Sequence, residues 1–264
     1  VKCASFGVTD LGAVVFEAPQ VERPAKAILK LDLISGGNVI ASNEQEIYVF
    51  PKIALPVRRG ASEHLHRARA PVGRMRAKEH EEPEGKGLFT PQFHPVLRRL
   101  GYRIVDGLSQ ADLAVVSTLD DPCREFVLQG GRVLFLAERD NALQTHIPGL
   151  GITPRKDSPW SGDWASSFGW HRFEDVPTGG VVNFAFADLT PEHIIQGFSP
   201  RDFALDVYAG LFVGWLHKPV ATVARRRAGR GEVLVSTFRL SRNLDTNPLA
   251  LHLFVELMQL ITGK

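Results

Sequence analysis

The sequence contains little that would support a disulfide framework, a membrane span or a polyanion-binding surface. Its 264 residues include only two cysteines, Cys3 and Cys123, too few for a set of disulfides or a multi-cysteine zinc site. No apolar run reaches the ~18 to 20 residues that cross a bilayer. The 31 Lys and Arg residues nearly balance the 29 Asp and Glu residues, and this small net charge of +2 argues against a dedicated nucleic-acid binder.

Nucleotide-binding and metal-binding motifs are missing as well. The P-loop and the Gly-x-Gly-x-x-Gly fingerprint do not occur, and Gly130-Gly131 precedes an expected strand instead of following one. Of the nine histidines only His64 and His66 have ligand-like spacing, and their charged surroundings are typical of solvated side chains. We therefore expect no cofactor and no metal ion. The chain starts at Val1 without a signal-peptide pattern, so we expect it to begin within a longer gene product or after processing.

The pattern along the chain divides it into three segments. Residues 1–56 hold short apolar runs separated by Pro, Gly and Asn, and we expect them to form part of an immunoglobulin-like β-sandwich. The strands expected there are 14–16, 27–34 and 47–50, with a hairpin loop at 35–38. Residues 57–89 are rich in Lys, Arg and Glu with almost no apolar periodicity, which is typical of a solvated linker or insertion.

Residues 90–264 alternate helix and strand patterns, which predicts an α/β domain. The expected strands are 102–105, 113–117, 132–136 and 232–237, and the expected helices are 94–100, 120–129 and 247–261. The helix at 120–129 has an Asp cap followed by a Pro near its first position. Short, continuously apolar strands joined by helices indicate a doubly wound, mostly parallel sheet.

The sequence offers no nucleophilic side chain at the position where α/β enzymes of the glutaminase type carry one. Cys123 is expected in the first turn of a helix, where the dipole would lower the pKa of a thiol. A small semi-buried side chain is the plainer interpretation, and we favour it. A glutaminase-type α/β fold places its nucleophile on a sharp turn directly after a buried strand, but here the strand 132–136 runs into Ala137 and Glu138.

Paired carboxylates of the glycosidase type are the remaining catalytic option. Acids in loop-like sequence that could converge are Glu138, Asp140, Asp163, Glu174 and Asp175. Most loop acids are helix caps or solvated charges, so we predict that the chain contains no catalytic residue.

The most unusual local feature is SPWSGDWASSFGWH at residues 158–171, which holds three of the four tryptophans. Large rigid rings separated by Ser and Gly are typical of contact surfaces. A long loop folded back on its own domain is the other interpretation, and both stay open. The candidate residues for carbohydrate or interdomain contact are Trp160, Asp163, Trp164, Phe168, Trp170 and His171.

Taken in order, several segments resemble the C-terminal region of glycoside hydrolase family 2, the β-galactosidase, β-mannosidase and β-glucuronidase group. The segments are LDLISGGNVIASN at 31–43, DLTPEHII at 188–195, GLFVGWLH at 210–217, and GEVLVSTFRL at 231–240 with Asn247-Pro248. The first resembles the last hairpin of the family's C-terminal sandwich. The others resemble the class I glutamine-amidotransferase-like α/β domain that follows the sandwich in some bacterial members.

This resemblance implies a non-catalytic accessory region of a glycoside hydrolase. The ~250 residues of a (β/α)₈ barrel cannot fit, so no family catalytic residue is transferred. The implied partner is the catalytic domain of the same polypeptide or of a neighbouring subunit, and the implied location is the periplasm or outside the cell. Two alternatives stay open: a carbohydrate-binding module that uses the loop from Trp160 to Trp170, and a free-standing amidotransferase-like hydrolase.

Overall fold

The computed structural model describes residues 10, 12–53, 87–139, 145–156, 158, 167–213 and 218–263. The chain divides into two compact units, Val1–Pro51 and Lys52–Lys264, and each forms its own structure. Residues 54–86, most of the expected charged connector, lie outside the described residues, so the predicted boundaries between 56 and 90 stay predictions. Among the helices of the described ranges, none combines the length and the apolar character that a bilayer crossing requires.

The described part of the first unit contains a two-stranded antiparallel hairpin of β1 (Ala25–Ser35) and β2 (Asn38–Val49). Gly36 and Gly37 make the turn with φ of +56° and +81°, which glycine adopts without steric cost. The expected loop is confirmed, because Ser35 pairs with Asn38. The strand expected at 14–16 is wrong: these residues form no strand, and their side chains are exposed.

The second unit is a mixed α/β fold on a ten-stranded sheet, and half of this sheet is parallel. The parallel strands, in spatial order, are β4 (Ile104–Val105), β3 (Gly87–Phe89), β5 (Ala111–Val116), β6 (Arg132–Leu136) and β12 (Gly231–Ser236). The central strands are buried on both faces, as their continuous apolar sequences predicted; Val115, Leu134 and Val235 are all 0% exposed.

The other half of the sheet is antiparallel, which corrects the expectation of a mostly parallel, doubly wound sheet. Beyond β12 follow β11 (Lys218–Ala228), β10 (Val207–Val213) and β8 (Ser167–His171). A side branch consists of β9 (His193–Gln196), which pairs with β11, and β7 (Gly151–Pro154), which pairs with β9. Gly229 and Arg230 alone connect β11 to β12, and so short a connection joins antiparallel strands only.

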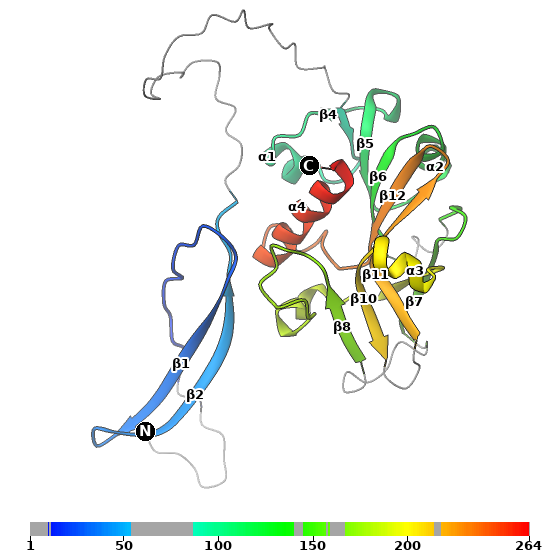
Figure 1. Cartoon of the computed structure of the whole chain (residues 1–264). Helices are drawn as coiled ribbons and strands as arrows, with labels where there is room; N and C mark the ends of the chain where they lie inside the picture. The colour runs from blue at the N-terminus through cyan, green and yellow to red at the C-terminus, as the bar shows by residue number, and fades with distance from the viewer. Residues whose placement is uncertain are drawn as a thin grey trace, which may run out of the picture. The chain divides into compact units, whose positions relative to one another are not determined.

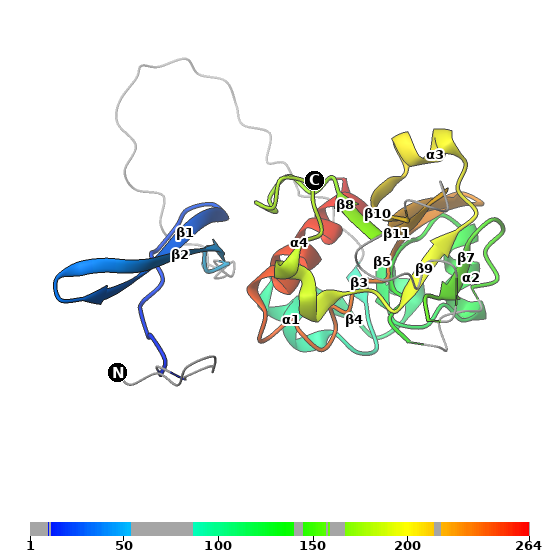
Figure 2. The ribbon, with the colours of Figure 1, turned by 90° about the horizontal axis from the view of Figure 1, so that it is seen from below.

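Helices cover both faces of the parallel half (Figures 1 and 2). The helices are α1 (His94–Arg99), α2 (Asp121–Leu128), α3 (Pro200–Leu205) and α4 (Pro248–Thr262), with short 3₁₀ turns η1 (Leu108–Gln110) and η4 (Phe184–Leu189). Val127 of α2 packs in one core cluster with Val133 and Phe135 of β6. Alternate residues of β6 face the other way, where α4 contacts β6 and β12.

The cap predicted for the second helix is confirmed. The Asp120 carboxylate accepts a hydrogen bond from the backbone N–H of Cys123 at 3.0 Å, and Asp120 itself has extended backbone angles. This contact satisfies one of the amide groups that have no partner inside the helix.

We expect Asp120→Ala to lower the free energy of unfolding by about 1 kcal/mol, because it removes this N-cap acceptor. Asp121→Ala is the matched control, since Asp121 is exposed and makes only a surface ion pair with Arg124, worth at most ~0.5 kcal/mol. Urea unfolding monitored by circular dichroism measures both. Equal losses in the two variants would contradict the capping role.

Candidate functional site

Three of the six predicted contact residues lie on β8, and the other three, Trp160, Asp163 and Trp164, lie outside the described residues. Phe168 is 51% exposed. Trp170 is partly buried, and its ring lies 6.4 Å from the ring of Phe203 in α3. A contact role for these residues stays a prediction, and on β8 Phe168 has the exposed ring that such a role needs.

His171 is buried among aromatic rings and serves the local fold. The backbone N–H of Phe173 donates to its Nδ1 at 3.2 Å, so Nε2 carries the proton and donates to the hydroxyl of Thr178 at 2.7 Å. The imidazole stacks on Phe173 and packs against Phe186. Burial lowers the pKa of His171 to about 4, which keeps the ring neutral at physiological pH.

Cys123 is a buried structural side chain, as the plainer interpretation had it. It is 4% exposed in the core between α2 and the sheet. Burial, together with the neighbouring Asp120 carboxylate, raises the pKa of the thiol to about 12, against the lowering that the helix dipole alone would give. The thiolate is therefore not populated near neutral pH.

Glu138, at the corner after β6, ties that strand to the loop after β12. Its Oε1 accepts hydrogen bonds from the backbone N–H groups of Leu240 and Ser241, both at 2.9 Å, and its Oε2 accepts from the Ser241 hydroxyl. Burial nevertheless raises the pKa of this carboxyl above its ordinary value, although the hydrogen bonds act in the opposite direction. The position that a nucleophile would occupy therefore holds a structural carboxylate.

Glu174 and Asp175 lie near a third acid that the sequence analysis did not consider, Glu256 of α4. Glu256 Oε1 accepts a hydrogen bond from the backbone N–H of Glu174 at 2.8 Å. Burial, and then the charges of Asp175 and Glu174, raise the pKa of Glu256 to about 7. These acids line a hollow of about 560 Å³ together with Arg172 and Arg225.

Asp140 and Asp163 lie outside the described residues. Across the described ranges, no group of three or more His, Cys, Asp and Glu side chains is arranged to hold a metal ion.

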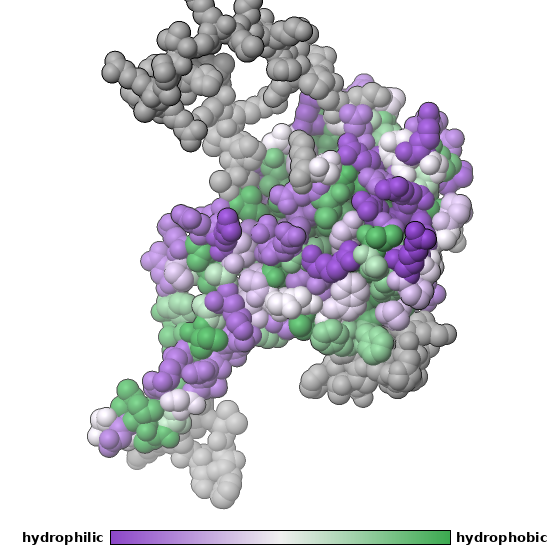
Figure 3. Space-filling model, in the orientation of Figure 1, coloured by the Kyte–Doolittle hydropathy of each residue, from purple (hydrophilic) through white to green (hydrophobic). Residues whose placement is uncertain are grey.

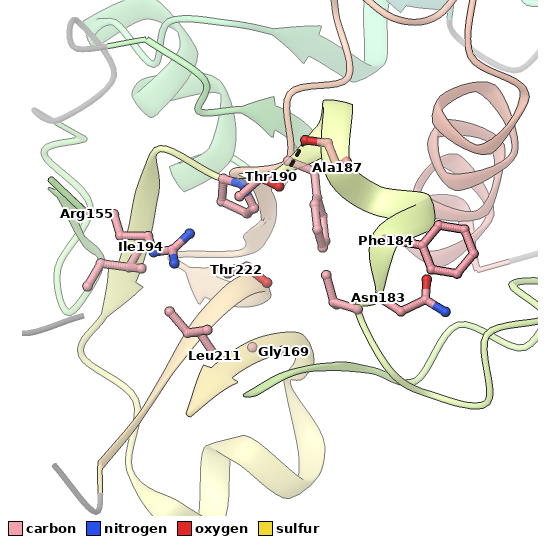
Figure 4. A pocket seen from close by; sticks show the side chains of 13 residues that line it. Arg155, Gly169, Asn183, Phe184, Ala187, Thr190, Ile194, Leu211 and Thr222 are labelled. Carbon is pink, nitrogen blue, oxygen red and sulfur yellow. Dashed lines mark hydrogen bonds between the residues drawn. The ribbon is translucent and has the colours of Figure 1, made fainter. Parts of the chain in front are cut away.

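A pocket of about 640 Å³ lies over the antiparallel half of the sheet (Figure 4). Its floor is formed by β8, β10 and β11, and η4 with the segment that follows it forms the opposite wall. Gly169 of β8 lets the segment that carries Val182 approach the strand closely, because a Cβ at residue 169 would lie 2.8 Å from the Cβ of Val182. Sequence reasoning missed this site, since its walls come from segments up to 83 residues apart, from Arg155 to Phe238.

The pocket is largely apolar, with a few polar groups at its edges. Ile194, Leu211 and Phe238 are among the apolar residues that line it. Arg155 enters from one side in Figure 4, and Thr222 belongs to the floor. No Asp or Glu is among the described residues that line this pocket.

Comparison with known proteins finds distant likeness among solved structures. No protein-family model matches the sequence, and no curated protein matches it. Among solved structures, a β-galactosidase from Rahnella sp. R3 is similar to 66% of this chain, with 13% identity and a TM-score of 0.34. The likeness takes in 32% of the β-galactosidase, so this chain spans about a third of the length of the protein it matches. No residue role is transferred from it.

We expect Glu138→Ala to lower the free energy of unfolding by about 2 to 3 kcal/mol, because it leaves the buried N–H groups of Leu240 and Ser241 without an acceptor. Glu138→Gln keeps one carbonyl acceptor and should lose less. The exposed Glu125 provides the control, and Glu125→Ala should change stability by no more than ~0.5 kcal/mol. Chemical denaturation measures all three, and a neutral Glu138→Ala would refute the tie between β6 and the β12 loop.

Stability should also fall as the pH rises through the range in which Glu256 loses its proton. The folded chain holds that proton up to about pH 7, whereas an unfolded chain releases it near 4.5, so rising pH between these values favours unfolding. The side chain keeps part of its surface in solvent, so we expect about 1 to 2 kcal/mol and not the ~3 kcal/mol that the shift alone implies. Thermal unfolding of Glu256→Gln should match wild type at pH 5 and exceed it at pH 8.5; a constant difference at both would count against this assignment.

Proposed function

We propose that this chain is a non-catalytic accessory region of a glycoside hydrolase acting on β-linked sugars, of the β-galactosidase or β-mannosidase type. In this proposal the β1–β2 hairpin completes an immunoglobulin-like sandwich, and the second unit is a class I amidotransferase-like α/β domain that lacks the nucleophile. The region braces the catalytic barrel or shapes its cleft. Its partner is the catalytic domain of the same polypeptide or of a neighbouring subunit.

The apolar surface of the hairpin is the observation that carries the proposal. Ile28, Ile34, Val39 and Ile40 are between 53% and 62% exposed, and Leu33 is 48% exposed. Figure 3 shows hydrophobic side chains gathered at the tip of the hairpin. A two-stranded hairpin alone is at best marginally stable in water, and contiguous exposed apolar surface marks a contact site. Strands supplied by another part of a larger protein would cover these side chains.

The second unit supports the non-catalytic part of the proposal. Glu138 at the nucleophile corner is engaged by the loop after β12, and the thiol of Cys123 is buried with its pKa raised to about 12. Both groups contribute to folding through contacts that catalysis would have to break. The chemistry of a sugar-cleaving enzyme would then come from the partner domain.

The isolated chain should give no hydrolysis of nitrophenyl β-galactosides or β-mannosides above the buffer rate, and the complete natural polypeptide should hydrolyse one of them. Steady-state assays of both proteins test this directly. Turnover by the isolated chain that disappears in Glu138→Gln or Glu256→Gln would overturn the accessory role. The accessory role would also be overturned if the complete natural polypeptide contained no barrel domain with a pair of catalytic carboxylates.

Hairpin variants of the complete polypeptide test the bracing role. Replacing Leu33 and Ile40 together by Asp should lower the thermal stability or the activity of the enzyme, since both apolar side chains would lose their cover. Replacing Asn43 and Gln45 by Asp adds the same charge at polar positions of the hairpin and is the control. If both pairs of changes have the same small effect, the hairpin does not support the catalytic domain.

A further inference from the structure

Two hollows of the second unit are each lined by a residue with a buried oxygen that has no hydrogen-bond partner within the described ranges. One is the hydroxyl of Thr222 in the pocket over the antiparallel half, and the other is Oε2 of Glu256 in the hollow beside α4. A hydroxyl keeps its proton at physiological pH, whereas a carboxyl can gain or lose one. Of these two positions, only Glu256 can therefore respond to a change of pH.

Glu256 ties α4 to the segment 172–183, which connects β8 to η4. The backbone N–H of Glu174 donates to Oε1 of Glu256 at 2.8 Å, across 82 residues of sequence. The two ends of the segment are held separately, since the N–H of Arg172 donates to β10 at 2.8 Å and the N–H of Val182 donates to β8 at 2.9 Å. The contact with Glu256 therefore lies at a corner between two fixed ends, where it can break while the sheet stays intact.

The carboxyl of Glu256 lies close to two other acids at this corner. The side chains of Glu174 and Asp175 are exposed and line the same hollow. The backbone N–H groups of these two residues favour the charged form of Glu256. Burial, and then the charges of Asp175 and Glu174, outweigh that effect and raise the pKa of Glu256 to about 7.

The basic side chains that line the hollow already have partners. Arg172 donates to a backbone carbonyl of α3 at 2.8 Å, and its guanidinium carbon lies 5.6 Å from the centre of the Tyr208 ring. Arg225 of β11 forms an ion pair with Asp206 at 3.1 Å. Gln259 is the remaining polar side chain among the described residues of the lining, and it carries no charge. An ionised Glu256 would therefore add a third negative charge to the corner without a cation dedicated to it.

We propose that the contact between Glu174 and Glu256 is a pH-sensitive latch, which holds the 174–175 corner on α4 while Glu256 keeps its proton and opens when Glu256 is ionised. In the open form the carboxylate is solvated and lies further from the other two acids, so its pKa returns toward 4.5. Because the open form releases the proton more readily, a rise in pH shifts the population toward it. The latch is independent of the accessory role and does not rest on it.

Amide hydrogen exchange of the full chain, resolved by NMR, tests the latch. The quantity compared is the protection factor, which is the exchange rate of an amide relative to its intrinsic rate at the same pH. We expect the protection of the Glu174 amide to fall about tenfold or more between pH 5 and pH 8 and to level off above about pH 7. Constant protection over this range would overturn the proposal.

A urea series separates a local opening from global unfolding. A small opening exposes little surface, so exchange of the Glu174 amide should not depend on low concentrations of urea. The amide of Leu134, in the central strand β6 and 0% exposed at its side chain, is the reference for global unfolding and should exchange faster as urea is added. If both amides show the same urea dependence, the corner opens only when the whole unit unfolds, and the proposal is wrong.

Three variants assign the charge that opens the latch. Glu256→Gln keeps a carbonyl acceptor but cannot ionise, so the protection of Glu174 should no longer depend on pH. Asp175→Asn removes one like charge, so the fall in protection should be smaller and should level off at a lower pH. Glu125→Gln, at an exposed position of α2, is the control and should keep the wild-type profile.

The variants also cover the case in which one of them does not fold. A pH dependence that persists in Glu256→Gln would show that another group is responsible and would overturn the assignment. If Glu256→Gln fails to fold, Asp175→Asn decides the question, because its profile should still shift to lower pH. An unshifted profile in Asp175→Asn would contradict the repulsion on which the latch depends.

Discussion

Burial of β5, β6 and β12 on both faces is the constraint from which the second unit follows. Alternate side chains of these strands point to opposite sides, so each side needs its own apolar cover. The α2 helix supplies one cover through Cys123 and Val127, and α4 supplies the other. The N-caps of α2 and α4 and the carboxylate of Glu138 then fix the loops that position these two helices.

This constraint also accounts for the structural contacts of Glu138 at the corner after β6. The carboxyl ends of neighbouring parallel strands meet at one edge of a sheet, and many α/β proteins place reactive groups there. In this chain the same edge holds Glu138, whose hydrogen bonds to Leu240 and Ser241 join β6 to the loop between β12 and α4. A carboxylate with several fixed donors is a structural element. A hollow lined mainly by apolar side chains lies instead over the antiparallel half.

The sequence predicted those elements whose signals are local. The Asp120 cap, Asn247-Pro248 and the apolar runs of β5, β6 and β12 each specify their structure within a few residues, and α1, α2, α4, β4, β5, β6 and β12 lie close to their predicted ranges. The three-residue strand β3 and the helix α3 were not predicted. The antiparallel half was missed, because β7 and β9 are only four residues long and the pairing of β10 with β11 shifts register twice. Such pairings depend on contacts between distant segments, which a periodicity analysis does not contain.

The candidate sites were less predictable for the same reason. A semi-buried Cys123 in the first turn of a helix was predicted from the local sequence, but Glu138 meets its partners 102 and 103 residues further along the chain. Thr222 could not be distinguished by sequence from any other threonine in a strand, because Thr is common there for its branched shape. Its hydroxyl becomes notable only once β9 and β12 are seen to diverge beside it.

Two hollows of the second unit differ in how their buried polar atoms respond to burial. Oε2 of Glu256 has no hydrogen-bond partner in the part of the chain that is described, but this carboxyl can take up a proton, and its raised pKa reflects that response. The Thr222 hydroxyl has no protonation change available near neutral pH and no hydrogen-bond partner within the described ranges, so its burial keeps its cost. A proton from solvent can therefore neutralise the Glu256 carboxyl in the hollow beside α4. The pocket at the branch of the sheet is bounded mainly by apolar side chains, which need no such compensation.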